Sequence, residues 1–264
     1  MFGVIFVKKF KEKIWVWGHP TNAFENKWGI TVKSNVSPGE GIKWLGGENV
    51  FYIPAGYEID PDEQVGLLSD KRTVGWALTP NNIDMVIELG RKYPNMKIGV
   101  LDDFFNVENK YNYLKYPIEF LREIADKLHA EGMELWMVVY SKHFIEETKP
   151  PVDMREYFKE FDGITFWFWN ESDVANYDIR MRDFFEQTEG VRRMVGCYLY
   201  NFGDEIPSTT EPTIYQLEKA YEYMKEGKIE GLIMHTNCVL DIGHEVPVVA
   251  KEWLAPRLED EMPD

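Results

Sequence analysis

Cysteine is nearly absent from this sequence, which has only Cys197 and Cys238 among its 264 residues. Both lie in or beside apolar segments of strand type, and the chain has no C-x-x-C or other metal-finger spacing. The sequence therefore argues against a disulfide framework or a structural metal site, and it predicts two thiols packed in the core.

A surplus of positive charge is also missing. The formal net charge is -16, the sequence pI is near 4.8, and no run of Lys and Arg forms a basic patch. Duplex and membrane-surface binders normally present a basic face, so nucleic acid is not expected as a partner. The acidity itself favours solubility.

Long apolar runs are lacking as well. The stretch Met1–Lys9 is apolar but too short for a transmembrane helix, and it lacks the basic-then-apolar order and cleavage site of a signal peptide. We therefore expect a cytoplasmic protein without a membrane partner, with secretion possible only if a signal had been removed. The sequence does not determine the oligomeric state.

Aromatic residues, by contrast, are abundant: they make up 15% of the chain, with 9 Trp, 14 Tyr and 16 Phe. Most of them can fill a core. In an acidic, cysteine-poor chain they also suit carbohydrate, because sugar C–H faces stack on indoles while carboxylates bind hydroxyls and do acid–base work.

Short apolar segments alternate with helical patterns about eight times, which predicts a single (β/α)8 TIM barrel domain over residues 1–264. The expected strands are Lys13–Pro20, Val50–Pro54, Thr73–Thr79, Ile98–Asp103, Glu134–Tyr140, Gly163–Asn170, Arg193–Asn201 and Gly231–Asn237. The expected helices include Ser37–Gly46, Thr79–Gly90, Tyr116–Gly132, Ser172–Glu189, Glu211–Met224 and Val246–Leu254. A short extra N-terminal strand, Met1–Phe10, is expected outside the barrel, and the acidic C-terminal tail is expected to fray.

The fourth expected strand ends in two adjacent carboxylates, Asp102 and Asp103. Uncompensated charge is costly to bury, so the strand leaves the core here, at the face where such barrels place their active sites. If Gly99 and Leu101 face the barrel axis, alternation directs Asp103 into the mouth and Asp102 toward the helices, although twist or a bulge could exchange them. The expected catalytic partner is Glu205 after strand seven, with Asp204 second.

Other polar and aromatic residues also lie at or near strand ends and are candidates for substrate binding. They are Trp17, His19, Trp76, Tyr140, Trp169, Asn170, Tyr200, Asn201 and His235.

Carboxylates after strands four and seven, aromatic lining and the barrel pattern together resemble the (β/α)8 glycoside hydrolases, as an uncharacterised branch. The Asn-Glu-Pro signature of strand four and the spaced Asp-rich motif of chitinase-like enzymes are absent. The sequence Asp-Asp-Phe-Phe is similar to the Asp-ended fourth strand of α-galactosidase-like enzymes, whose second carboxylate follows strand six. That similarity would implicate Glu171 or Asp173.

The resemblance implies a hydrolase of glycosidic bonds that needs no cofactor and acts on an oligosaccharide or small sugar. Asp103 would be its general acid or nucleophile. Two alternatives stay open: a metal-dependent sugar isomerase or lyase using His19, His235 and a strand-four Asp, and a non-catalytic glycan-binding barrel. The sugar, the linkage, the stereochemical outcome and exo or endo action are left open by the sequence.

Overall fold

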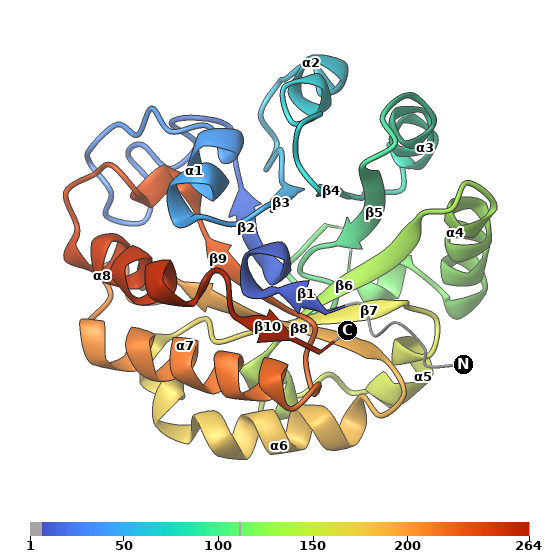
Figure 1. Cartoon of the computed structure of the whole chain (residues 1–264). Coiled ribbons are helices and arrows are strands. Elements are labelled where there is room, and N and C mark those ends of the chain that lie inside the picture. Colours follow the sequence, from blue (N-terminus) through green and yellow to red (C-terminus); the bar gives the residue numbers. More distant parts are fainter. Residues whose placement is uncertain (1–6, 111, 264) are drawn as a thin grey trace, which may run out of the picture.

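The computed structural model describes residues 7–110 and 112–263. Eight parallel strands form a closed barrel in the order of the sequence (Figure 1). They are β2 (Ile14–Gly18), β3 (Asn49–Tyr52), β4 (Thr73–Ala77), β5 (Met96–Leu101), β6 (Glu134–Tyr140), β7 (Gly163–Trp167), β8 (Arg192–Tyr198) and β9 (Gly231–His235). The predicted (β/α)8 fold is confirmed.

Helices lie outside the barrel and connect successive strands (Figure 1). They are α1 (Pro38–Leu45), α2 (Pro61–Gly66), α3 (Ile83–Lys92), α4 (Ile118–Ala130), α5 (Met154–Phe158), α6 (Tyr177–Gln187), α7 (Thr210–Lys225) and α8 (Glu245–Leu254). Among the described residues, no helix is long and apolar enough to cross a membrane.

Local sequence signals account for individual helices, as α1 illustrates. The Ser37 side chain accepts a hydrogen bond from the backbone N–H of Glu40, whose carboxylate accepts from the N–H of Ser37 in return. Pro38 occupies the first turn, and Gly46 ends the helix in the left-handed region at φ 83°. Ser37, Pro38 and Gly46 are thus local signals in the sequence for the start and the end of this predicted helix.

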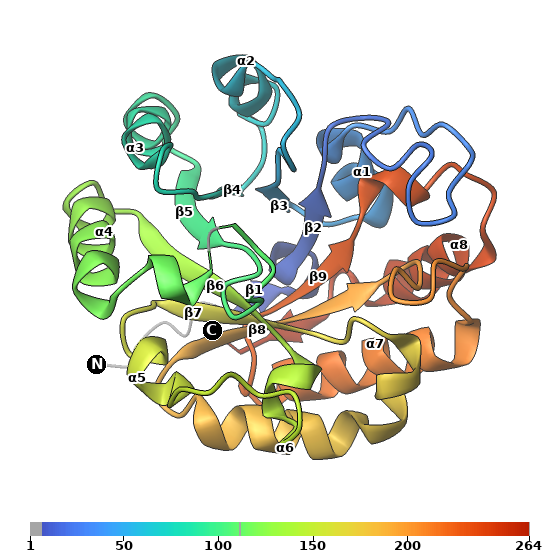
Figure 2. The ribbon, with the colours of Figure 1, turned by 180° about the vertical axis from the view of Figure 1, so that it is seen from behind.

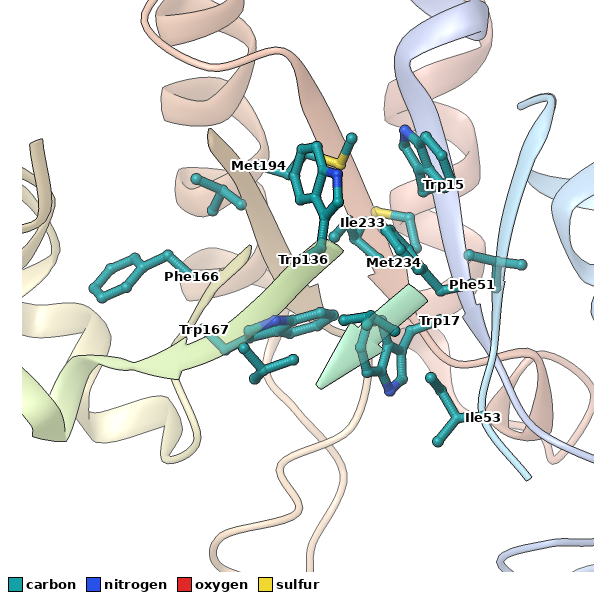
Figure 3. Packing of buried hydrophobic residues seen from close by; sticks show 14 of the residues in the cluster. Trp15, Trp17, Phe51, Ile53, Trp136, Phe166, Trp167, Met194, Ile233 and Met234 are labelled. Carbon is teal, nitrogen blue, oxygen red and sulfur yellow. The ribbon is translucent and has the colours of Figure 1, made fainter. Parts of the chain in front are cut away.

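The barrel interior is filled by large aromatic side chains that lie over glycines of the next strand. A Cβ on Gly196 of β8 would lie 2.0 Å from the Trp167 ring, and a Cβ on Gly163 of β7 would lie 2.4 Å from the Trp136 ring. Trp17 and Trp167 meet edge to face with ring centroids 5.3 Å apart (Figure 3). The core is therefore solid below the mouth, as expected for a barrel of this size.

A small antiparallel sheet lies outside the barrel. It joins β1 (Lys8–Lys9) to β10 (Glu261–Met262) and is drawn in front of the barrel in Figure 1. The extra N-terminal strand is thus confirmed at its end, while residues 1–6 of the predicted strand lie outside the described residues. The prediction of a frayed tail is wrong, because the Met262 side chain is buried.

The predicted facing of β5 is also wrong. A Cβ on Gly99 would meet Leu78 and Leu128, and Leu128 belongs to α4, so Gly99 faces the helices. A Cβ on Gly75 would meet both Phe51 and Ile98 inside the barrel, so Ile98 faces the barrel interior. Alternation then directs Asp102 toward the barrel axis.

The cysteine prediction is confirmed. Cys197 and Cys238 are both buried free thiols, and burial raises the pKa of each to about 12. A buried thiol that stays protonated is a poor nucleophile, so neither cysteine is a candidate nucleophile.

Candidate functional site

A cavity of about 280 Å³ opens at the carboxyl ends of the barrel strands. Every barrel strand except β4 contributes to it, either directly or through the loop that follows. Its lining residues are Trp17, His19, Phe24, Trp28, Ile53, Ala55, Asp102, Asp103, Val138, Tyr140, Trp167, Trp169, Tyr198, Phe202 and His235. The cavity is thus mostly aromatic, with a few polar groups, as ligand sites commonly are.

Asp102 and Asp103 both line this cavity, although they are neighbours in sequence. Asp102 follows β5 on the axis side. Asp103 has φ 52°, in the left-handed region, and this turn of the chain returns its side chain to the same cavity. Asn109 donates to the carbonyl oxygen of Asp102 at 3.0 Å, and the N–H of Asn106 donates to that of Asp103 at 3.0 Å. A strained residue held by such contacts at a cavity wall is typical of functional sites.

The two carboxyl groups have different surroundings. Burial raises the pKa of Asp102 well above its ordinary value, and the nearby charge of Asp103 raises it further. Tyr140, at the end of β6, donates a hydrogen bond of 2.7 Å to Oδ1 of Asp103. Asp102 is therefore the carboxyl group that tends to hold a proton, while Asp103 has a donor beside it.

Tyr140 and Tyr198 line the same cavity as the two Asp carboxyl groups. Burial raises the pKa of both phenols well above the ordinary value, and the charges of Asp102 and Asp103 add to the effect. Both phenols therefore stay protonated and can donate hydrogen bonds.

His19, after β2, and His235, at the end of β9, lie together in the same cavity with ring centroids 5.3 Å apart. Burial lowers the pKa of His19 to about 3 and that of His235 well below its ordinary value. Both imidazoles are therefore neutral near pH 7. The aromatic rings of Phe24, Tyr198 and Phe202 surround them.

Five of the nine predicted substrate-binding residues come together in the cavity. These are Trp17, His19, Tyr140, Trp169 and His235. Trp167 and Tyr198 were missed, although each precedes a selected residue, Trp169 or Tyr200, by two positions. The alternation of strand side chains could have identified them.

The other four predicted residues lie elsewhere. Trp76 is outside the cavity, fully buried and stacked on Tyr52 with ring centroids 4.7 Å apart. Tyr200 donates to the carbonyl oxygen of Trp28 at 2.8 Å. Asn170 packs against Gly203, and Asn201 donates to Asp204 at 2.9 Å.

The predicted partner carboxylates do not line this cavity. Glu205 and Asp204 are exposed on the loop after β8. Glu171 accepts from the backbone N–H and hydroxyl of Thr209, each at 2.7 Å, and Asp173 accepts from Ser141 at 3.0 Å. Within residues 7–110 and 112–263, Asp102 and Asp103 are thus the acidic residues of the cavity.

The described part of the chain also contains no group of three His, Cys, Asp or Glu side chains placed to hold a metal ion. His19 and His235 lie on neighbouring strands, while Asp102 follows a strand on the opposite side of the barrel. The residues named for the metal-dependent alternative do not fit a metal ion.

No protein-family model matches the chain, and no curated protein matches it. Several solved structures, by contrast, superpose on the chain. A GH113 β-1,4-mannanase superposes with a TM-score of 0.54 at 10% identity, over 95% of this chain and 100% of the mannanase. An endo-β-N-acetylglucosaminidase from Cordyceps militaris gives 0.53 at 14% identity, over 92% and 90%.

The tryptophan synthase A-subunit from Pyrococcus furiosus is as similar, with a TM-score of 0.52 at 10% identity over 95% of this chain and 98% of the subunit. At such identities the likeness shows the fold alone. The chain shares its (β/α)8 barrel with glycoside hydrolases and with an enzyme of another class, so function has to be argued from the cavity.

Proposed function

We propose that this protein hydrolyses a glycosidic bond in the cavity at the carboxyl ends of its barrel strands. The observation that carries the proposal is the pair Asp102 and Asp103, two carboxyl groups in different surroundings within one aromatic cavity. Glycosidic cleavage needs a protonated carboxyl group to donate to the leaving oxygen and a carboxylate to stabilise the positive charge on the sugar ring.

The different surroundings of the two carboxyl groups support a division of roles between them. Asp102, whose pKa is raised, is the proposed general acid: its proton passes to the glycosidic oxygen as the C–O bond breaks. Asp103, oriented by Tyr140, stabilises the cationic sugar. Water then adds to the anomeric carbon and gives its proton to the carboxylate left on Asp102, which restores the acid. Trp17, Trp167 and Trp169 provide the surfaces on which a sugar ring can stack.

The proposal predicts that Asp102→Asn and Asp103→Asn fold normally and lower kcat/KM by about 10²- to 10⁴-fold, the usual contribution of a positioned acid or base. The measurement is hydrolysis of a panel of chromogenic glycosides by the wild type and each variant. Asp84→Asn is the control, because the Asp84 side chain is 89% exposed on α3 and Asp84 does not line the cavity.

Glu205→Gln and Asp204→Asn test the alternative second carboxylate. A loss as large as that of Asp103→Asn would place Glu205 or Asp204 in the mechanism. Near wild-type activity of Asp103→Asn would remove Asp103 from it.

One observation favours a second candidate, a non-catalytic glycan-binding barrel. Among the described residues, no third carboxylate lines the cavity to face Asp102 and Asp103 across a bound sugar. Binding of glycans by the wild type without turnover of any glycoside in the panel would support this candidate and contradict the proposed hydrolase.

A further inference from the structure

The imidazoles of His19 and His235 form a wall of the cavity that the proposed chemistry does not use. The two residues are only 5% and 8% exposed. Both nitrogens of His19, and Nδ1 of His235, have no hydrogen-bond partner among the described residues. The Ile53 backbone acts to raise the pKa of His19 against the larger effect of burial, but it does not meet hydrogen-bond geometry. Buried polar atoms without partners are costly, and the two residues that carry them line a cavity that a ligand can enter.

The imidazole wall lies opposite the carboxylates. In the closed ring of eight strands, β2 is four positions from β6, and β9 is four positions from β5. His19 and His235 are therefore across the barrel from Tyr140 and Asp102. A ligand that spans the cavity meets hydrogen-bonding imidazoles at one end and the carboxyl pair at the other.

Among the described residues, no Lys or Arg lines the cavity. An anionic group bound here would face Asp103 without a compensating cation, which is unfavourable in a cavity lined mostly by aromatic side chains. A neutral imidazole has one N–H donor and one acceptor nitrogen. Two such rings side by side suit a pair of hydroxyl groups, which also donate and accept.

Loops close the cavity behind the imidazoles. Figure 2 shows the loop between β2 and α1 beside the segment that follows β9, where Asn237 accepts from the N–H of His19 at 2.8 Å. The Tyr200 hydroxyl donates a hydrogen bond to the carbonyl oxygen of Trp28, which lies on the loop between β2 and α1. A Cβ on Gly29 would lie 2.4 Å from the carbonyl oxygen of Glu205, so these loops are in close contact. Packed loops on the side of the imidazole wall favour the end of a sugar chain over its middle.

The volume agrees with a closed pocket for one ring. At about 280 Å³ the cavity is at the lower limit of ligand sites, which span about 300 to 1,000 Å³. That space suits one sugar ring better than two.

We propose that the cavity binds one uncharged sugar ring at a chain end. Two neighbouring hydroxyl groups of this ring form hydrogen bonds with His19 and His235, and the glycosidic oxygen lies at Asp102. The protein would then act on terminal sugars rather than within a chain. This inference rests on the proposed function for the cleavage, but its binding part can be tested without turnover.

The experiment titrates the wild type with free neutral hexoses, the corresponding N-acetylhexosamines and the corresponding hexuronic acids by isothermal calorimetry. We expect at least one neutral sugar to bind, and its uronic acid to bind at least about 10-fold more weakly. His19→Phe and His235→Phe should each weaken binding by about 10-fold while the melting temperature is unchanged or higher, because an apolar ring of similar shape replaces unpartnered polar atoms.

His129→Gln is the matched control. This histidine lies near the end of α4, pairs with Asp162 at 2.8 Å, and is outside the cavity, so its replacement should leave sugar binding unchanged. A lowered melting temperature together with weakened binding in both His→Phe variants would indicate a structural role for the imidazoles and would contradict the inference.

The proposed function and this inference can fail separately. Turnover of internal bonds in an oligosaccharide, with no binding of monosaccharides, would overturn the inference and leave the hydrolase standing. Histidine-dependent binding of a neutral monosaccharide without any glycoside turnover would overturn the hydrolase and leave the ring-binding site. Tighter binding of the uronic acids, or no binding by any sugar tested, would overturn the inference.

Discussion

Asp102 and Asp103 share one cavity because the backbone changes conformation between them. In a regular strand, neighbouring side chains point to opposite faces, and only one of the two could reach the mouth. The positive φ of Asp103 breaks the alternation. The cost of such a conformation is about 1–3 kcal/mol, and local contacts from Asn106 and Asn109 hold it.

The raised pKa of Asp102 has a consequence for stability. Because the folded state holds this proton more tightly than the unfolded chain does, wild-type stability falls as the pH rises from the ordinary Asp range through the raised pKa. Asp102→Asn has no such proton to lose. We therefore expect Asp102→Asn to be more stable than the wild type at neutral pH, with the difference growing over that pH range.

Denaturant unfolding at several pH values measures this difference. Asp84→Asn should show no comparable difference. If Asp102→Asn and the wild type differ by the same amount at all pH values, Asp102 does not retain a proton in the folded state.

At the scale of elements, neighbouring strands determine the floor of the cavity. Trp167 of β7 lies across Gly196 of β8, and its indole N–H donates to the hydroxyl of Thr165 at 2.9 Å. The ring stays flat over the backbone only because residue 196 has no side chain. A substitution on β8 can therefore alter a site whose aromatic surface comes from β7.

Gly196→Ala should destabilise the fold by roughly 1–3 kcal/mol, the usual cost of overpacking, because its Cβ would lie 2.0 Å from the Trp167 ring. The displaced indole should also change the near-ultraviolet circular dichroism and weaken sugar binding. Gly39→Ala, in helix α1, is the matched control, because its Cβ would meet the flexible Leu68 side chain, at 3.3 Å, and the more distant Lys71 side chain. Equal stabilities of Gly196→Ala and Gly39→Ala would contradict this account of the floor.

Across the whole molecule, β1 and β10 join the two ends of the described chain beside the barrel. Lys8 pairs with Met262, and the N–H of Phe10 donates to the carbonyl oxygen of Asp260 at 2.9 Å. Phe10 and Met262 are both buried. The small sheet is separate from the barrel strands, so within the described residues it adds to the fold through buried side chains such as Phe10 and Met262.

Met262→Ala should lower the free energy of unfolding by about 2–5 kcal/mol, the range for truncating a buried methionine. Glu261→Ala, in the same strand, should have little effect because the Glu261 side chain is 71% exposed. Thermal unfolding of both variants measures the contrast, and a neutral Met262→Ala would mean that the small sheet is not needed for stability.

The sequence by itself determined the architecture. Each barrel strand is a short apolar run, each major helix has an apolar face and a recognisable end, and these signals are local, so they can be read residue by residue. It also identified Asp102, Asp103 and five of the cavity's other residues, because strand ends in such barrels converge on one face.

Only the tertiary structure decided which side chains meet. Trp76 and Tyr200 have the same chemistry as the residues of the cavity, but the face of the strand or the course of the loop places them elsewhere. The carboxyl pair was predicted as Asp103 with Glu205, yet the cavity brings together Asp103 and Asp102. The direction in which a side chain points depends on the twist of the strands and on the left-handed residue Asp103. It also depends on glycines that leave space for an indole ring from the neighbouring strand. These effects act between segments that are distant in the sequence.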